Sequence, residues 1–315
     1  MFHTHHRSRR SLALLSVTGL AAGLVLSACG SDDGGDDAFS SGGGDGDTIV
    51  VGSANFPESE LLMQIYAQAL EAKGVDVETT PNIGAREVYM EAFESGDIDL
   101  LPEYNGALLA YLMPDGVPED VTSPEDVEAA LQDVLPEGSE TLPQSDAEDK
   151  DTLTVTQETA DEYGLETIAD LEPVAGDLVV GAGPEWRERY QGLIGLEDKY
   201  GVVFGEFRPL DAGGPLTVAA LQDGTIDVAN VFSTDSAIAT NDWVVLDDPE
   251  NLYLSENIIP LINSDKVTDD VEDALNGVSE ALTTENLTEY LARVQVDRED
   301  PVSVAQAFLE EYDLL

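Results

Sequence analysis

The sequence predicts an α/β protein in which two similar lobes flank a ligand-binding cleft. Two observations lead to this prediction. The second half of the chain repeats markers of the first half, and each half has the order strand, helix, strand, helix, strand. That order is typical of a parallel sheet covered by helices. Because the repeat doubles one folding unit, we expect two sheets.

The repeat consists of four pairs of markers in the same order, each pair 128 or 129 positions apart. Glycines at the ends of the two helices fit the left-handed C-terminal cap, where a side chain would clash. Such a constant spacing indicates two similar lobes. The pairs are the apolar strands 49–51 and 178–180 with Gly52 and Gly181, Gly84 and Gly213 before a helix, Gly96 and Gly224 after it, and segments 97–100 and 225–228.

Two prolines mark the starts of helices. Pro57 and Pro215 suit the first helical position, because the backbone donor that proline lacks would have no partner there. Before the second of these helices, Gly213 and Gly214 leave the backbone amides open to a carboxylate, which the helix dipole would favour. Paired glycines are also common in ordinary turns, so both interpretations stay open.

Residues just after the parallel strands are the first candidates for ligand contact, because ligands bind beyond the carboxyl ends of such strands. In the first half these include Asn55, Tyr104 and Asn105. In the second half they lie in the segments 182–185 and 231–235. The repeat places Tyr104 and Phe232 at matching positions that face a common cleft. Alternatively, either ring caps the core of its own lobe.

The first 28 residues are predicted to be a lipoprotein signal peptide: basic residues precede an apolar run from Leu12 to Leu26, and Cys29 follows small residues. We expect lipidation of Cys29, which would anchor the protein to the outer face of the cell membrane. A plain secretion signal with a leftover cysteine is the alternative. Residues 29–47, rich in Gly, Ser and Asp, are predicted to be a flexible tether.

The composition excludes several classes of function. Thirteen basic residues against 65 acidic ones give a net charge of −52, which opposes nucleic-acid binding. This charge fits either solubility in salt or a field that collects a cationic ligand. All three histidines lie in the signal segment, so histidine-dependent catalysis and metal sites are excluded from the mature chain. We expect no metal, no cofactor and no enzymatic activity.

Five segments of the sequence follow a known family pattern: NFPESELLMQIYAQALEAKG, GDIDLLPEYNG, VTQETADEYGLETIADL, RPLDAGGPLTVAAL and FSTDSAIA. They resemble the substrate-binding proteins of osmoprotectant ABC transporters, which take up glycine betaine, choline, carnitine or proline betaine. The resemblance implies a type II periplasmic-binding-protein fold, ABC permease subunits as partners, and a monomer. It implies lobes of residues 48–150 with 254–315, and of residues 151–253.

The resemblance also implies a ligand site in which aromatic rings surround a trimethylammonium group by cation–π contact. Tyr104 matches a ring of that cage, and Phe232 falls where relatives often carry one. Two positions depart from the pattern, because Glu256 and Asp151 stand where relatives place rings. These carboxylates either stabilise the cation themselves or lie on the surface.

The ligand's carboxylate is expected to bind near Arg187 or Arg189. Two further possibilities stay open: the same fold binding an amino acid or another small cation, and a carboxylate-based extracellular hydrolase. The full set of predicted ligand-binding residues is Asn55, Tyr104, Asn105, Asp151, Arg187, Gly214, Phe232, Ser233, Thr234, Glu256 and Asn257.

Overall fold

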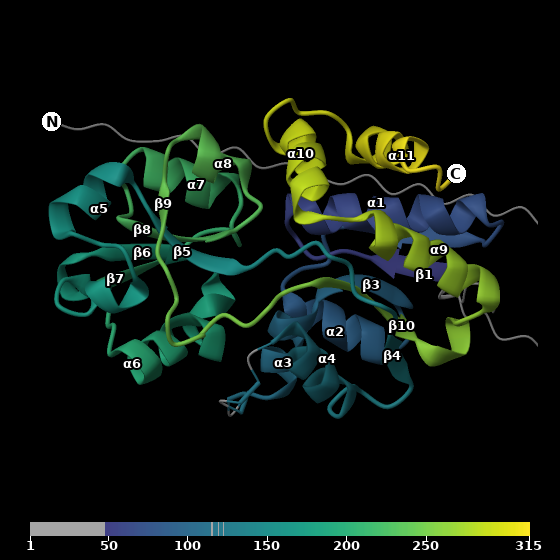
Figure 1. Ribbon diagram of the computed structural model, residues 1–315, viewed down its shortest axis with the longest axis horizontal. Coiled ribbons are helices and arrows are strands. Elements are labelled where there is room, and N and C mark those ends of the chain that lie inside the picture. Colours follow the sequence, from purple (N-terminus) through teal and green to yellow (C-terminus); the bar gives the residue numbers. More distant parts are fainter. Residues whose placement is uncertain (1–47, 115, 119, 122) are drawn as a thin grey trace, which may run out of the picture. The chain divides into compact units, whose positions relative to one another are not determined.

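The computed structural model describes residues 48–315 except 115, 119 and 122. The predicted signal peptide, Cys29 and the tether therefore lie outside the described residues. The described chain forms two five-stranded sheets, so the expectation of two α/β lobes is confirmed (Figure 1). In the following, each lobe is one sheet with the helices that pack on it.

The first sheet has the strand order β2-β1-β3-β10-β4. Strands β1, β2 and β3 are parallel, and β10 runs antiparallel to both of its neighbours. The strands are β1 (Ile49–Gly52), β2 (Val77–Thr80), β3 (Leu100–Tyr104), β4 (Ser139–Thr141) and β10 (Ile258–Asn263), and the helices are α1 (Pro57–Ala72), α2 (Arg86–Glu94), α3 (Asn105–Leu112), α4 (Pro124–Gln132), α9 (Asp269–Ala281), α10 (Thr284–Gln295) and α11 (Pro301–Glu311).

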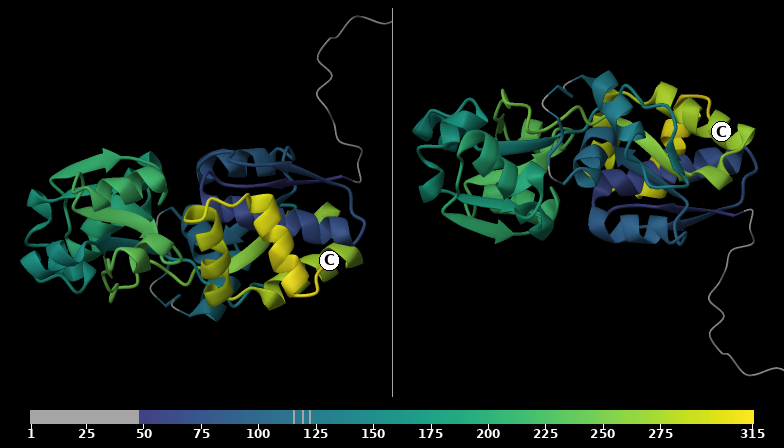
Figure 2. Two further views of the ribbon diagram at one scale, coloured as in Figure 1. Left: turned by 90° about the horizontal axis from the view of Figure 1, so that it is seen from above. Right: turned by 90° about the horizontal axis from the view of Figure 1, so that it is seen from below.

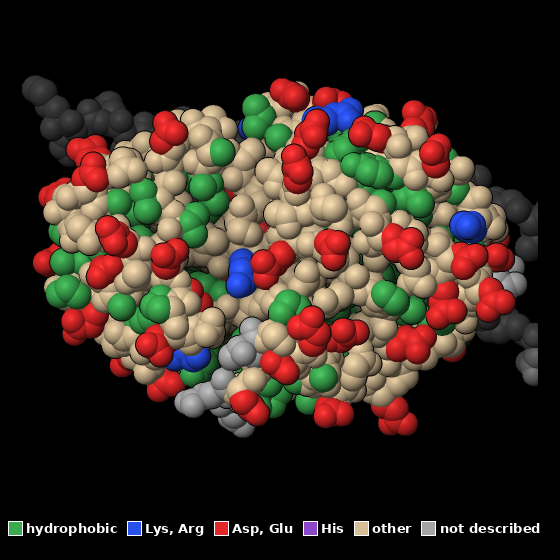
Figure 3. Space-filling view, in the orientation of Figure 1, with side chains coloured by type: hydrophobic (Ala, Val, Ile, Leu, Met, Phe, Trp, Pro, Cys, Tyr) green, Lys and Arg blue, Asp and Glu red, His purple; other side chains and the backbone are tan. Residues whose placement is uncertain are grey.

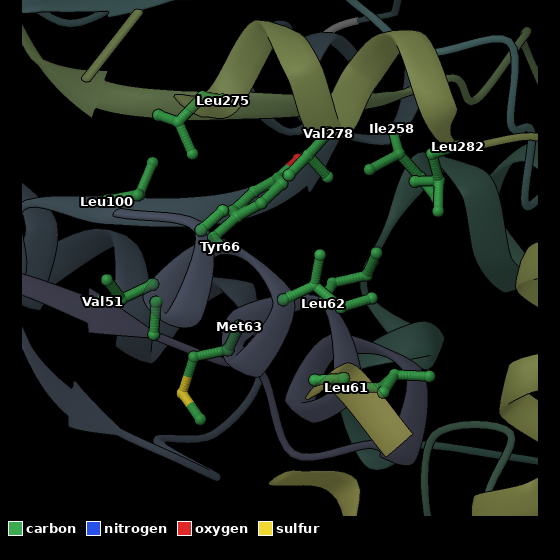
Figure 4. Close-up of a cluster of buried hydrophobic side chains, with 14 of the residues drawn as sticks. Val51, Leu61, Leu62, Met63, Tyr66, Leu100, Ile258, Leu275, Val278 and Leu282 are labelled. Carbon is green, nitrogen blue, oxygen red and sulfur yellow. The ribbon is translucent and has the colours of Figure 1, made fainter. Parts of the chain in front are cut away.

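The two faces of the first sheet bury separate apolar clusters. Alternation along β3 sends Leu100 into the cluster under α1, α9, α10 and α11, and Leu101 into the cluster under α2, α3 and α4. Figure 4 shows the first cluster, in which Tyr66 of α1 lies among aliphatic side chains. The C-terminal helices lie beside α1 (Figure 2). The last sixty residues thereby complete the core of the lobe that begins the chain.

The second sheet has the order β7-β6-β8-β5-β9, with β6, β7 and β8 parallel and β5 antiparallel to β8 and β9. In the part of the chain that the structure describes, the second lobe has no equivalent of helices α9, α10 and α11. Its strands are β5 (Asp151–Val155), β6 (Val179–Ala182), β7 (Glu206–Pro209), β8 (Val228–Phe232) and β9 (Val244–Val245), and its α-helices are α5 (Gln157–Tyr163), α6 (Gly195–Tyr200), α7 (Pro215–Gln222) and α8 (Ser236–Thr240). Short turns of 3₁₀ or π type are Ile168–Leu171, Ala175–Asp177, Pro184–Arg187, Tyr190–Ile194 and, after β10, Ser264–Lys266.

The repeat extends to individual hydrogen bonds. Asp99 accepts the backbone N–H of Val50 at 2.9 Å, and its own N–H donates to the carbonyl of Val50. Asp227 makes the same two contacts with Val179 in the second lobe. These bonds join the segment after each repeated helix to the repeated strand before that helix, which is β1 in the first sheet and β6 in the second. A shared sequence pattern therefore produces the same backbone geometry twice.

The chain passes between the sheets in two segments that lie side by side. The first crossover runs from Glu148 into β5, and the second leads from the second lobe through Glu256 into β10. Glu148 and Asn257 form an isolated antiparallel bridge, and the N–H of Asp149 donates to the carbonyl of Glu256. Both connections therefore form one two-stranded joint between the lobes.

Acidic side chains are spread over the face that Figure 3 shows, with few Lys or Arg among them. Within the described residues, no helix has the length and apolar character that crossing a membrane requires.

Candidate ligand-binding site

The main candidate site is a cavity at the joint between the lobes, with about 590 Å³ of space between its lining atoms, its open mouth included. The lining comes from the carboxyl ends of strands in both sheets and from both crossovers. The residues are Ala54, Asn55, Phe56, Ala85, Arg86, Tyr89, Tyr104, Ala107, Asp149, Asp151, Gly183, Glu185, Trp186, Arg189, Ala212, Asn230, Phe232 and Glu256.

Three aromatic rings cluster in this cavity. Phe56 precedes α1, Tyr104 ends β3, and Phe232 ends β8. The ring centre of Phe56 lies 4.9 Å from that of Phe232 and 6.1 Å from that of Tyr104. Gly213 has a φ of 59°, and a Cβ there would lie 2.8 Å from the Phe232 ring, so only glycine leaves room for it. The cluster combines rings of both lobes.

Two arginines line the cavity, and each already holds a carboxylate. Arg86, at the start of α2, donates from Nε and Nη2 to the two oxygens of Glu103, both at 3.0 Å. Tyr89 donates to the same carboxylate at 2.6 Å. Arg189 forms a matching two-bond pair with Glu87 of the first lobe, at 2.9 Å. The two N–H groups of Nη1 and the second N–H of Nη2 are left on each guanidinium for a ligand.

Carboxyl groups also line the cavity, without such partners. Asp151 accepts a hydrogen bond from Asn230 on Oδ1 at 2.8 Å, and Glu256 accepts one from Gln191 on Oε1 at 3.1 Å. Burial raises the pKa of Glu256 well above its ordinary value, and the charge of Asp151 raises it further. Burial likewise raises the pKa of Asp151. These groups gain stability from a cation or a hydrogen-bond donor that enters the cavity.

Beside the rings, two buried acids connect the lobes. Glu58 of α1 accepts hydrogen bonds from Tyr104 at 2.8 Å and from Thr234 at 2.6 Å. Asp149 of the first crossover accepts the N–H of Thr234 at 3.0 Å. Burial and the neighbouring Glu58 carboxylate raise the pKa of Asp149 well above its ordinary value. This rise in pKa favours the protonated form of Asp149, and Glu58 is the nearby acceptor.

The structure brings five of the predicted residues together in the cavity: Asn55, Tyr104, Asp151, Phe232 and Glu256. Both departures from the expected pattern, Asp151 and Glu256, line this cavity and do not lie on the surface. Glu256 is only 2% exposed.

Four other predicted residues hold the joint between the lobes. Asn105 accepts the N–H of Asn257, and the Asn257 side chain donates to the carbonyl of Ser145. The hydroxyl of Ser233 accepts the N–H of Lys150. Thr234 donates its hydroxyl to Glu58 and its backbone N–H to Asp149. These side chains fix the crossovers beside the cavity and are not part of its lining.

The last two predicted residues lie elsewhere. Arg187 stacks on the ring of Phe207 at 4.6 Å and does not line the cavity. Gly214 caps α7, but the amides of Leu216 and Thr217 there donate to Asp211 at 2.9 and 2.8 Å. The open anion site considered for this helix start is thus occupied by the protein's own carboxylate.

Among the cavity residues that the sequence interpretation missed are Arg86, Tyr89, Trp186 and Asn230. Arg86 and Tyr89 are one helical turn apart, which is a signal for a shared face. That signal does not reveal which face looks into the cavity. Trp186 lies on the segment after β6, and its indole Nε1 is buried with no hydrogen-bond partner among the described residues.

Comparison with known proteins identifies the family. Residues 47–311 match the OpuAC family, described as the substrate-binding domain of an ABC-type glycine betaine transport system. The carnitine transport binding protein OpuCC of Listeria monocytogenes is 26% identical over 310 residues, which cover 96% of this chain and 97% of that protein. A glycine-betaine-binding protein of Pseudomonas aeruginosa is 26% identical over 290 residues, covering 88% and 92%.

A solved structure described as a glycine betaine/carnitine/choline ABC transporter superposes with a TM-score of 0.66 at 23% identity, covering 84% of this chain and 99% of that one. This likeness confirms the expected type II periplasmic-binding-protein fold. The family match spans most of the sequence. The chain therefore belongs to the family of substrate-binding domains of ABC-type glycine betaine transport systems.

Proposed function

We propose that this protein captures a quaternary-ammonium osmoprotectant of the glycine betaine type and delivers it to the permease subunits of an ABC importer. The observation that carries the proposal is the cluster of Phe56, Tyr104 and Phe232, which joins rings of both lobes in one cavity. A methylated ammonium cannot donate a hydrogen bond, so ring faces and carboxylates are the groups that stabilise it.

The mechanism is closure of the lobes on the ligand. A ligand that touches rings of both lobes favours the arrangement in which these rings are close together, and its binding energy offsets the cost of closing. The paired crossovers at Glu148 and Asn257 are the joint about which the lobes would turn. The ion pair of Arg189 with Glu87 and the bond from Thr234 to Glu58 add contacts between the lobes in the closed arrangement.

The cellular setting is part of the same proposal. Signal cleavage before Cys29 and lipidation of that residue would hold the protein outside the cell, on the outer face of its membrane. There it acts as a monomer and binds without chemical turnover. Its relatives are substrate-binding proteins of transporters.

Calorimetry and thermal unfolding with a panel of ligands test this function. We expect glycine betaine, choline, carnitine or proline betaine to raise the unfolding temperature of the full-length protein, because a ligand stabilises the state that it binds. Proline, which has no methylated ammonium, should bind more weakly than the best of these. Tightest binding of proline or another amino acid would favour the second candidate, and binding of none of the panel would refute the proposal.

A further inference from the structure

The charges in the cavity do not balance. The two lining arginines are neutralised by Glu103 and Glu87, each through two hydrogen bonds. Asp151, Glu185 and Glu256 also line the cavity, and in the described part of the chain none of them forms an ion pair. The lining therefore holds more carboxyl groups than unpaired guanidinium groups, even when Asp149 is left out of the count.

Two of these acids are built into the joint beside the rings. Asp151 is the residue of β5 that pairs with Phe232 of β8, and Glu256 lies in the returning crossover. Each has a hydrogen bond on one carboxylate oxygen and, among the described residues, none on the other. The free oxygens, Oδ2 of Asp151 and Oε2 of Glu256, are available as acceptors or as a counter-charge.

A zwitterion and a cation differ in what they bring into this cavity. Both place a methylated ammonium among the rings, but a zwitterion such as glycine betaine also brings a carboxylate. That carboxylate would face Asp151 and Glu256, while one bidentate edge of each arginine, Nε with Nη2, already holds a carboxylate of the protein. Burying an uncompensated charge next to like charges is costly, whereas a cation compensates the buried acids.

Building on the function proposed above, we propose that Asp151 and Glu256 set the charge selectivity of this cavity. They favour a quaternary-ammonium ligand of net positive charge with a hydroxyl in place of the carboxylate, such as choline, over zwitterions such as glycine betaine. The hydroxyl can donate to a free carboxylate oxygen, which a ligand carboxylate cannot do.

The test compares choline with glycine betaine by calorimetry on the full-length protein at one fixed salt concentration. We expect choline to bind at least about tenfold more tightly. Asp151→Asn and Glu256→Gln, each nearly isosteric, should weaken choline by roughly tenfold and leave glycine betaine unchanged or tighter, so that the ratio of the two affinities falls. Glu128→Gln, on the exposed side of α4, is the control and should keep the ratio of the parent.

Two results would overturn the inference while the proposed function stands. The parent could bind glycine betaine as tightly as choline, which would mean that the remaining N–H groups of the arginines suffice for a carboxylate. Alternatively, both variants could weaken the two ligands equally, which would mean that the acids act only on the shared ammonium. If the parent binds neither ligand nor any other methylated ammonium, the proposed function itself fails. Near-parental unfolding temperatures of the variants verify that binding and not folding has changed.

Discussion

The two lobes share one backbone repeat but differ in the side chains that it places near the cavity. In the first lobe, Glu103 of β3 is fully buried and paired with Arg86. The residue 128 positions later is Val231 of β8, which lies in an apolar cluster. The same strand position therefore holds a buried, ion-paired carboxylate in the first lobe and an apolar side chain in the second. The repeat specifies where strands end and helices begin, and it leaves the polarity of each position free to diverge.

The segments after the two strands that the repeat relates, β1 and β6, differ as well. After β1 the chain forms the continuous helix α1, of sixteen residues. After β6 it forms two short turns before α6, and Gly192 in the second turn approaches the carbonyl of Trp186 so closely that a Cβ would clash. The broken segment brings Glu185, Trp186 and Arg189 to the cavity. A regular helix therefore builds the core of the first lobe, and an irregular segment supplies binding groups from the second.

The largest expected effect is loss of the buried ion pair of the first lobe. Arg86→Met leaves Glu103 buried without a counter-charge, which should lower the free energy of unfolding by about 3–5 kcal/mol. Arg208→Met in the second lobe breaks an exposed pair with Glu206 and should cost no more than about 1 kcal/mol. Urea unfolding measures both. The double variant Arg86→Met with Glu103→Leu should recover most of the lost stability. Equal losses of stability in Arg86→Met and Arg208→Met would contradict the expected difference between the buried pair of the first lobe and the exposed pair of the second.

The two rings related by the repeat should respond differently to truncation. Tyr104→Ala and Phe232→Ala should each weaken binding of the best quaternary-ammonium ligand by roughly ten- to hundredfold, or about 1–3 kcal/mol. Tyr104→Ala should also lower the unfolding temperature, because its hydroxyl donates to buried Glu58. Tyr104→Phe retains the ring and should lose stability more than affinity. Parental affinity of Tyr104→Ala together with lower stability would make that ring a core residue only.

The buried acids at the joint predict a dependence of stability on pH. Because the pKa of Asp149 in the folded protein lies well above its unfolded value, its favourable contribution is complete at low pH and is lost as pH rises through the folded pKa. Asp149→Asn does not titrate and can still accept from Thr234. It should therefore match the parent near pH 4 and exceed it at pH 8 by on the order of 1–2 kcal/mol.

Denaturant unfolding at several pH values measures this difference. Asp146→Asn, an exposed neighbour in the same segment, is the control and should leave the pH dependence unchanged. An Asp149→Asn protein that is less stable by the same amount at both ends of the range would disprove a protonated Asp149.

The smallest effect is expected for the ion pair between the lobes. Arg189→Gln removes the contact with Glu87, whose carboxylate is 44% exposed, so solvent screening limits the loss to no more than about 1 kcal/mol, or roughly fivefold in affinity. Arg187→Gln, two residues away and stacked on Phe207, is the matched control for affinity. If Arg187→Gln weakens binding more than Arg189→Gln does, the assignment of Arg189 to the cavity is wrong.

Local signals in the sequence were sufficient for the architecture. Gly96 and Gly224 both have positive φ and follow α2 and α7, where such glycines terminate helices. Asp99 and Asp227 make the same backbone contacts in both lobes. These features depend on residues close in the chain or within one sheet, so the spacing of a repeat reveals them. The resemblance to osmoprotectant-binding proteins followed from the same motifs, and the family match confirms it.

The sequence by itself thus predicted two α/β lobes with a cleft between them, and it offered Tyr104, Phe232, Asp151 and Glu256 as candidates for the lining of that cleft. Only the tertiary structure decided how charges are paired there. Arg189 meets Glu87 across 102 residues of chain, and Thr234 meets Glu58 across 176. In a sequence with 65 acidic residues, many partners are available to each of the few arginines. Which carboxylates are neutralised and which stay free for a ligand depends on the direction of each side chain after the lobes have packed, and no local pattern encodes that direction.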